Sequence, residues 1–156
     1  MSELSEQQLQ DLREYLQATP YIKYNGIVID HIDPQQAILH VEMRHDLENP
    51  YGMAHGGMLF TMIDTTAGAA ARADGRKYVT VNASVNYLRS GRSGKITAKG
   101  TLVRRGRTAT VVDVAVTDEA GDLLTTGTVT MFCHDADGSG DGVRELPIAD
   151  HDADAK

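Results

Sequence analysis

The chain has 156 residues, enough for one domain with a substantial core; 41% of them are hydrophobic and 24% are charged. This composition is ordinary for a globular protein, and no stretch approaches the roughly 20 apolar residues of a membrane-spanning helix. The N-terminus begins with acidic residues and glutamines, so we expect no secretory signal. Cys133 is the only cysteine, which excludes an internal disulfide and favours a reducing compartment, so we expect a cytoplasmic protein.

The net charge of −7 is unevenly distributed along the chain. Residues 135–156 are rich in Asp, Gly and Ala and hold seven acidic residues against two basic ones, which predicts a flexible acidic tail. Between Gly75 and Val112 there are nine basic residues and no acidic one. Such a segment can attract a phosphorylated ligand, although solvated strand ends give the same pattern. We expect no nucleic-acid partner, because the whole chain is acidic and no recognition motif accompanies the bases.

The N-terminal region, residues 1–20, is predicted to contain an amphipathic helix over residues 5–18. Ser5 and Gln8 fit a capping box, and apolar residues then recur at helical spacing. The helix is expected to end at Thr19-Pro20, because a residue before proline disfavours the helical conformation. We interpret this helix as a lid or a packing helix without chemistry of its own.

Residues 21–134 are predicted to form one α+β domain. Two strands, 24–33 and 37–45, precede a polar loop and a helix over residues 58–73, which Asp74-Gly75 closes as a glycine cap. Alternation in the next strand places Val79, Val81, Ala83, Val85 and Tyr87 on one face. The order is β-β-α-β-β-β-β, with one long helix inside an antiparallel sheet. The four strands after the helix are residues 78–88, 95–104, 108–117 and 123–133.

The predicted long helix carries only two charged residues, Asp64 and Arg72. A helix that is apolar on every face is buried in a protein core, and 16 residues are too few for a good membrane span. A carboxylate in this setting is costly to bury. Asp64 should therefore have either a structural hydrogen-bond partner or a chemical task.

Gly56 and Gly57 stand where this helix begins. Unpaired amide groups and the positive end of the helix dipole form a ready anion site there, and the oxyanion of a thioester carbonyl is one natural occupant. Gly56 and Asp64 are separated by eight residues, or roughly 12 Å along a helix axis. One carbonyl cannot reach both groups of a single chain. Two helices packed antiparallel about a two-fold axis would bring them together, so joint action predicts a dimer.

The combination Asn49-x-x-Gly52-x-x-His55-Gly56-Gly57 with Asp64 in the following helix resembles the hotdog fold, and most closely the PaaI-like acyl-CoA thioesterases, relatives of 4-hydroxybenzoyl-CoA thioesterase. The resemblance extends over residues 24–134. It includes the strand sequence from Val81 to Arg89 and the hairpin from Val103 to Arg107. It therefore implies an antiparallel sheet wrapped around one central helix.

The resemblance also implies roles for individual residues. Asp64 corresponds to the catalytic carboxylate, as a general base or as a nucleophile, and Gly56, with or without Gly57, to the backbone donor for the oxyanion. His55 and Asn49 correspond to a polar pair near the thioester, although His55 could simply cap the helix and Asn49 could simply form a turn. The remaining implied site residues are Thr80, which positions water unless it is an ordinary strand residue, and Arg89, Arg105 and Arg107, which meet the nucleotide and phosphates of coenzyme A.

The implied function is hydrolysis of an acyl-coenzyme A thioester by a homodimer, and the resemblance also suggests that two such dimers pair into a tetramer. It requires no cofactor and no metal, and the remaining histidines show no metal-ligand spacing with Cys133. The alternatives are a non-catalytic acyl-CoA sensor, a hotdog hydratase or dehydratase, and a structural protein. The acyl group stays open between an aromatic and a medium-chain fatty acyl group. Its pocket is expected to depend on the packing of Tyr24, Tyr51, Met53, Phe60 and Met62.

Overall fold

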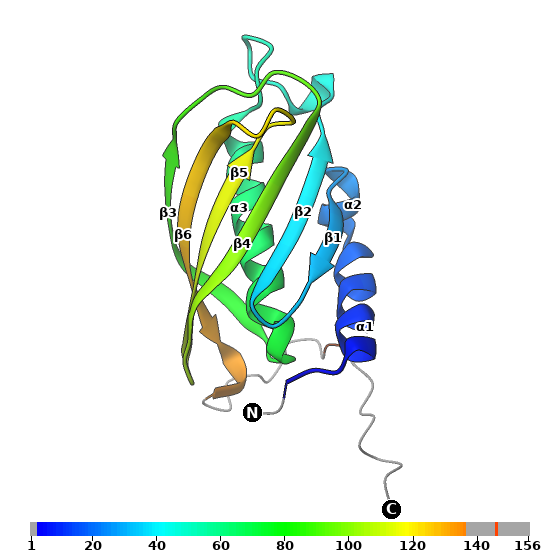
Figure 1. The fold of residues 1–156 in the computed structure, drawn as a ribbon, viewed down its shortest axis with the longest axis vertical. Helices are drawn as coiled ribbons and strands as arrows, with labels where there is room; N and C mark the ends of the chain where they lie inside the picture. The colour runs from blue at the N-terminus through cyan, green and yellow to red at the C-terminus, as the bar shows by residue number, and fades with distance from the viewer. Residues whose placement is uncertain (1–2, 137–145, 147–156) are drawn as a thin grey trace, which may run out of the picture.

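The computed structural model describes residues 3–136 and Leu146, which form one antiparallel sheet around a long central helix (Figure 1). The strands follow the spatial order β1-β2-β4-β5-β6-β3, and every neighbouring pair is antiparallel. The central helix is α3 (Gly56–Ala71). The predicted α+β hotdog architecture is confirmed. The strands are β1 (Val28–Ile32), β2 (Gln36–Glu42), β3 (Tyr78–Tyr87), β4 (Lys95–Arg105), β5 (Ala109–Thr117) and β6 (Leu123–Cys133).

The helix α1 (Glu6–Gln17) confirms the predicted N-terminal helix. Its capping box is complete: Ser5 Oγ accepts from the Gln8 amide at 3.2 Å, and the Ser5 amide donates to Gln8 Oε1 at 2.9 Å. At the other end, the Gln17 side chain donates to the Ile27 carbonyl and accepts from the Ile29 amide. These bonds use polar groups at the edge of the sheet, so α1 lies alongside β1 (Figure 1).

A second short helix, α2 (Pro20–Tyr24), lies where the chain was expected to approach its first strand. Proline suits the first turn of a helix because its φ is already helical and its missing amide is not needed there, so Thr19-Pro20 both ends α1 and starts α2. Gly26, with φ of 68°, then turns the chain into β1. The strand prediction was therefore wrong over residues 24–27, since β1 begins at Val28.

Small residues allow α3 to approach the sheet closely. A Cβ atom at Gly127 of β6 would lie 2.8 Å from Ile63 Cγ2, and one at Gly100 of β4 would lie 3.0 Å from Thr66 Cγ2. Most of the helix is buried as predicted, and Gly75 ends it in the left-handed conformation after a short 3-10 turn. Phe60 differs from the prediction. It was expected to help shape the acyl pocket, but it is 39% exposed, because it belongs to the stripe of α3 that the sheet does not cover.

The edge strand β3 contains a bulge that changes which side chains face the helix. Its pairing with β6 runs from Thr80 opposite Met131 to Asn82 opposite Thr130, so Val81 is the extra residue. Thr80 is exposed, but its hydroxyl points toward α3 and the buried Met131, and strand alternation resumes out of phase after the bulge. The predicted single face from Val79 to Tyr87 was wrong for this reason. Val79 and Val81 are exposed, whereas Ala83, Val85 and Tyr87 face the helix side of the sheet.

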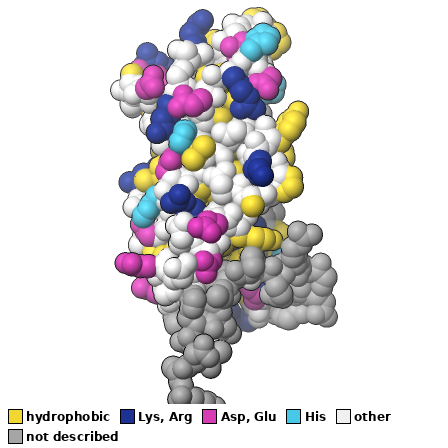
Figure 2. Space-filling view, turned by 90° about the vertical axis from the view of Figure 1, so that its right-hand side faces the viewer, with side chains coloured by type: hydrophobic (Ala, Val, Ile, Leu, Met, Phe, Trp, Pro, Cys, Tyr) yellow, Lys and Arg dark blue, Asp and Glu magenta, His cyan; other side chains and the backbone are white. Residues whose placement is uncertain are grey.

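The outer face that carries α1, α2 and β1 mixes acidic and basic side chains (Figure 2). Examples are the contact of His40 with Asp30 and the ion pair of Arg44 with Asp46, both at 2.7 Å. In the part of the chain that the structure describes, no helix is both long and apolar enough to cross a membrane. Most of the predicted acidic tail, 137–145 and 147–156, lies outside the described residues.

Candidate active site

Asp64 and Thr80 form the polar centre of the candidate site. Thr80 Oγ1 donates a 2.6 Å hydrogen bond to Asp64 Oδ1, which joins the middle of α3 to the bulged part of β3. Among the described residues, Thr80 is the only hydrogen-bond donor to the Asp64 carboxylate, so Oδ2 has no protein partner there. Asp64 is partly buried. A partly buried carboxylate with one fixed and one open oxygen can accept a proton or attack a bound carbonyl group.

Asp64 and Thr80 lie on the wall of a cavity of about 400 Å³. The N-terminal helices form the opposite wall, and a 2.9 Å hydrogen bond between Tyr21 Oη and Thr61 Oγ1 ties α2 to α3. The five residues expected to shape the pocket do not line this cavity, and two of them, Tyr24 and Tyr51, are strongly exposed. The aromatic and apolar lining comes mainly from Tyr15, Leu16, Tyr21, Ile22, Ile29 and Met131.

The N-terminus of α3 is organised by His55. This residue is the N-cap, and its Nδ1 accepts a 2.8 Å hydrogen bond from the Gly57 amide, so the Gly57 amide is already engaged. No hydrogen bond from the Gly56 amide is found within the described residues. The Gly56 carbonyl accepts from Tyr87 Oη at 2.9 Å, which fixes the first helical turn against β3. Gly56 is therefore the donor that this helix end leaves available.

Gly56 and Asp64 remain apart within one chain. Both lie on α3, at its first residue and about two turns later, which corresponds to roughly 12 Å along the axis. The cavity at Asp64 does not include Gly56 in its lining. The described chain therefore does not bring these two predicted groups to one point.

Asn49 shapes the loop that leads into α3. Its side-chain oxygen accepts from the amides of Tyr51 and Met53, at 2.9 and 3.1 Å, and its carbonyl accepts from Gly52. Gly52 has φ of 74°, which is the conformation that such a tight turn requires. The turn-forming alternative thus accounts for these contacts of the Asn49 side chain.

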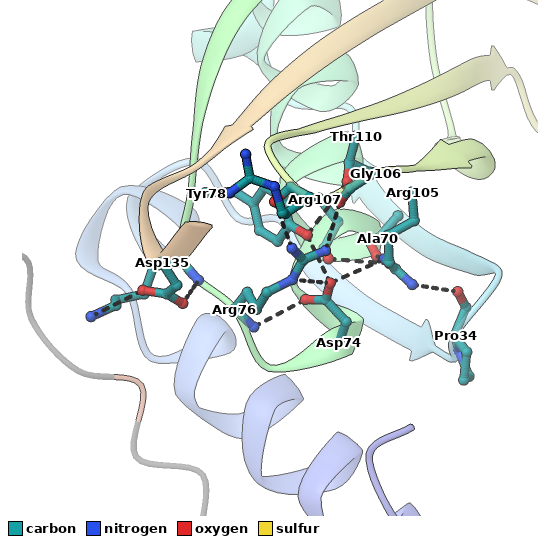
Figure 3. Close-up of polar contacts among 12 residues, drawn as sticks. Pro34, Ala70, Asp74, Arg76, Tyr78, Arg105, Gly106, Arg107, Thr110 and Asp135 are labelled. Atoms are coloured by element: carbon teal, nitrogen blue, oxygen red, sulfur yellow. Dashed lines mark hydrogen bonds and ion pairs between the residues drawn. The ribbon is translucent and has the colours of Figure 1, made fainter. Parts of the chain in front are cut away.

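Arg105 is held inside the fold by contacts with the C-terminal end of α3 (Figure 3). Its guanidinium donates to the carbonyl groups of Ala70, Ala71 and Pro34, and its Nε lies 3.2 Å from Asp74 Oδ2. The Arg105 side chain is only 15% exposed. These hydrogen bonds satisfy carbonyl groups at the C-terminus of the helix that have no partner within it. They leave little of the guanidinium free to bind a ligand.

Arg89 and Arg107 are exposed, and they lie at opposite ends of the sheet. Arg89 pairs with Asp122 at 3.1 Å and donates from its backbone to Leu124, near the start of β6. Arg107 donates to the Ala136 carbonyl at 3.1 Å, just beyond the end of β6. An 11-residue strand spans roughly 35 Å at about 3.3 Å per residue. One chain therefore cannot direct both side chains at one phosphate group.

Sequence reasoning missed two residues that the structure brings to the site. Tyr87 was assigned to a strand face without a task, whereas its hydroxyl holds the Gly56 peptide. Arg72, the second charged residue of the apolar helix, lines the same cavity as Asp64. A charged residue in an otherwise apolar helix is a sequence signal that could have identified Arg72 as a candidate site residue. In the described part of the chain, no group of three or more His, Cys, Asp or Glu side chains could hold a metal ion.

Known proteins share this fold and part of this sequence. The model of the Thioesterase superfamily matches residues 51–125. A hypothetical thioesterase of Streptococcus pneumoniae TIGR4, solved with coenzyme A, is 34% identical, with 69% of this chain and 84% of that chain covered and a TM-score of 0.66. The 1,4-dihydroxy-2-naphthoyl-CoA hydrolase of Listeria monocytogenes is 28% identical over 102 residues, which are 64% of this chain and 83% of the relative.

A further neighbour shows the fold alone. The PaaI protein of E. coli, from the phenylacetic acid degradation operon, is 22% identical, with a TM-score of 0.78 over 83% of this chain and 95% of that chain. Two mutant structures of the streptococcal thioesterase replace an aspartate and a threonine that lie 16 positions apart. Asp64 and Thr80 have the same separation of 16 positions. With its fold, its family match and its identity to the streptococcal protein, this chain belongs to the hotdog-fold thioesterase superfamily and is a thioester hydrolase.

Proposed function

We propose that the protein hydrolyses acyl-coenzyme A thioesters to a free acid and coenzyme A. The observation that carries this proposal is the Asp64 carboxylate, which is bound by Thr80 at 2.6 Å on the wall of a cavity of about 400 Å³. The coenzyme A in the streptococcal structure and the CoA thioester named for the Listeria hydrolase support coenzyme A as the carrier.

Asp64 can act by two routes. As a general base, it takes a proton from water while the water oxygen attacks the thioester carbon, and the tetrahedral oxyanion then collapses and expels the coenzyme A thiolate, which takes up the proton. As a nucleophile, its open oxygen attacks the same carbon and expels the thiolate, and water hydrolyses the resulting mixed anhydride. A single turnover in heavy-oxygen water detects the second route if label enters Asp64 instead of the released acid.

The proposal places each active site between two copies of the chain. Asp64 comes from one subunit, and the Gly56 amide that stabilises the oxyanion comes from the other, because the two groups are about 12 Å apart within one helix. The edge strand β3 supports such an assembly. It is ten residues long and exposes Val79 and Val81, and an apolar edge of this kind is normally covered.

The arrangement of the basic residues fits the same assembly. Antiparallel pairing of two β3 strands brings the Arg89 end of one sheet to the Arg107 end of the other. Two arginines that are far apart in one chain could then face one coenzyme A from different subunits. We do not assign Arg105 to this role, because its guanidinium is engaged with the C-terminus of α3.

The direct test is release of free thiol from aromatic and medium-chain acyl-CoA substrates by the wild type and Asp64→Asn. We expect the substitution to lower kcat about a hundredfold or more, because it removes the base or nucleophile while keeping the size of the side chain. Asp113→Asn is the matched control. Asp113 accepts from Thr128 at 2.6 Å on the outer face of the sheet, so its loss should leave kcat close to the wild-type value.

Three outcomes would contradict the proposal. Full activity of Asp64→Asn would remove Asp64 from the mechanism. Binding of acyl-CoA without thiol release from any substrate would favour a sensor, and a change in a double bond without free thiol would favour a hydratase or dehydratase.

A further inference from the structure

Arg72 is the C-cap of α3, and it continues the stripe of the helix that carries Asp64, about two helical turns further along. Asp64, Gly68 and Arg72 are spaced at intervals of four residues, and all three line the cavity. A Cβ atom at Gly68 would lie 2.5 Å from Arg72 Nη1. The arginine side chain therefore folds back over Gly68, in the direction of Asp64, and occupies space that any other residue at position 68 would fill.

The Arg72 guanidinium is positioned by the fold without being neutralised there. Nη2 donates to the Tyr78 carbonyl at 2.8 Å, and no carboxylate of the described residues forms an ion pair with Arg72. Burial lowers the pKa of Arg72, and the negative charge of Asp64 offsets this effect only in part. A guanidinium nevertheless stays protonated, so the protein holds a partly desolvated cation at the wall of its cavity.

The cavity between the two charged groups is suited to a short carbon chain. Leu16, Ile22 and Met131 supply apolar lining, while Asp64 and Arg72 supply groups of opposite charge. Lys77 also lines the cavity, but its charge is already paired with Asp135 at 3.3 Å. From Asp64 to Gly68, where the guanidinium lies, the helix rises roughly 6 Å. A thioester beside Asp64 could therefore send the far end of a short acyl chain to Arg72.

We propose that the preferred acyl group of this enzyme ends in a carboxylate, and that Arg72 binds this carboxylate as a specificity-determining residue. The inference rests on the proposed acyl-CoA hydrolase function and adds its substrate class. A carboxylate is the ligand that a guanidinium binds best, through two parallel charge-assisted hydrogen bonds. A hydrocarbon end would instead leave the cation partly desolvated and without a carboxylate to pair with, which costs free energy.

A different role for Arg72 would be to balance the charge of Asp64. In that case every substrate would depend on Arg72 to the same degree, because the effect would act on the catalytic carboxylate. Under our proposal the dependence is selective for substrates with a terminal carboxylate. The ratio of kcat/KM for two substrates of equal chain length therefore separates the two roles.

The experiment compares adipyl-CoA with hexanoyl-CoA, and glutaryl-CoA with pentanoyl-CoA, with spontaneous hydrolysis measured and subtracted. In each pair the two acyl chains have equal numbers of carbons and differ at the far end. We expect the wild type to favour the carboxylated member of at least one pair by about tenfold or more. Arg72→Met should lower this preference by about ten- to a hundredfold, and Arg72→Lys should restore part of it.

Two variants guard against loss of folding as an explanation. Gly68→Ala keeps the charge of Arg72 but displaces its guanidinium, since the added Cβ would collide with Nη1, and it should also reduce the preference. Arg104→Met removes an arginine from the exposed side of β4 and should keep the wild-type ratio. Binding of adipyl-CoA to Asp64→Asn, measured by calorimetry, should weaken when Arg72→Met is added.

The outcomes distinguish this inference from the proposed function. Hydrolysis of the neutral acyl-CoAs with no preference for a terminal carboxylate would overturn the role of Arg72 and leave the hydrolase intact. If Arg72→Met lowers kcat/KM equally for both members of a pair, the role of Arg72 is to balance the charge of Asp64 instead. If no thiol is released from these four substrates or from the aromatic and medium-chain acyl-CoA panel, the proposed hydrolase function is itself wrong.

Discussion

Thr80 Oγ1 donates a 2.6 Å hydrogen bond to Asp64 Oδ1, and a bulge at the next residue, Val81, sets the direction of the threonine side chain. Without the bulge, Thr80 would share its face with Asn82 and Ser84, because side chains alternate along a strand. The extra residue thus places a hydroxyl donor beside the central helix. One carboxylate oxygen is thereby fixed, while no described residue donates a hydrogen bond to the other.

The first prediction concerns this hydrogen bond. Thr80→Val keeps the shape of the side chain and removes the donor, so we expect kcat to fall about tenfold, as for the loss of a hydrogen bond to a charged group. Thr80→Ser retains the hydroxyl and should keep most of the activity. Thr128→Val breaks the equivalent bond to Asp113 on the outer face and should leave kcat near the wild-type value. Equal kcat values in all three variants would show that the Thr80 hydroxyl is not used.

The second prediction concerns the sharing of the active site between subunits. Gly56→Pro removes only the amide donor at the first position of α3, a position where proline is well accepted, and His55 already has an extended conformation. We expect both Gly56→Pro and Asp64→Asn to lose most activity. When the two variants are unfolded, mixed and refolded, heterodimers should regain activity, because one of their two sites combines an intact Gly56 with an intact Asp64.

The control for this complementation is each variant refolded alone, which should stay inactive. If both groups of a site came from the same chain, every heterodimer site would still carry one defect, and mixing would restore nothing. Light scattering of the wild type should give at least the mass of a dimer. A monomer with full activity would contradict the shared site.

The third prediction concerns the cap of α3. His55→Ala removes the acceptor of the Gly57 amide, so we expect the free energy of unfolding to fall by about 1 kcal/mol, measured by denaturant unfolding. His55→Asn can accept the same hydrogen bond and should recover most of the stability. If His55→Asn recovers stability but turns over slowly, the imidazole also acts near the thioester.

The fourth prediction separates a structural arginine from a ligand-binding one. Arg105→Met leaves Asp74 and the carbonyl groups of Ala70 and Ala71 without this partner, so the free energy of unfolding should fall by roughly 3 kcal/mol. Arg107→Met changes an exposed side chain and should cost less than about 0.5 kcal/mol, while raising KM for the CoA substrate. If Arg105→Met raises KM and leaves the free energy of unfolding unchanged, Arg105 contributes to the coenzyme A site instead of to stability.

The sequence alone was sufficient for the features that depend on local pattern. The apolar run with Asp64 predicted the buried helix, and Gly75 marked its end, because periodicity and glycine caps are read within a few residues. The β-β-α-β-β-β-β order followed in the same way. The short helix α2 was missed because Pro20 was taken only as a helix stop, although proline also starts helices.

The tertiary structure decided the features that depend on pairing between distant segments. Whether Thr80 or its neighbours face the helix depends on the register with Met131, 51 positions away, and a single extra residue reverses the outcome. Whether an arginine is buried depends on what packs around it, so the basic run alone could not separate Arg105 from Arg107. The sequence determined which chemical groups the protein carries and on which elements, whereas packing decided which of these groups meet, because side-chain direction is set by contacts far along the chain.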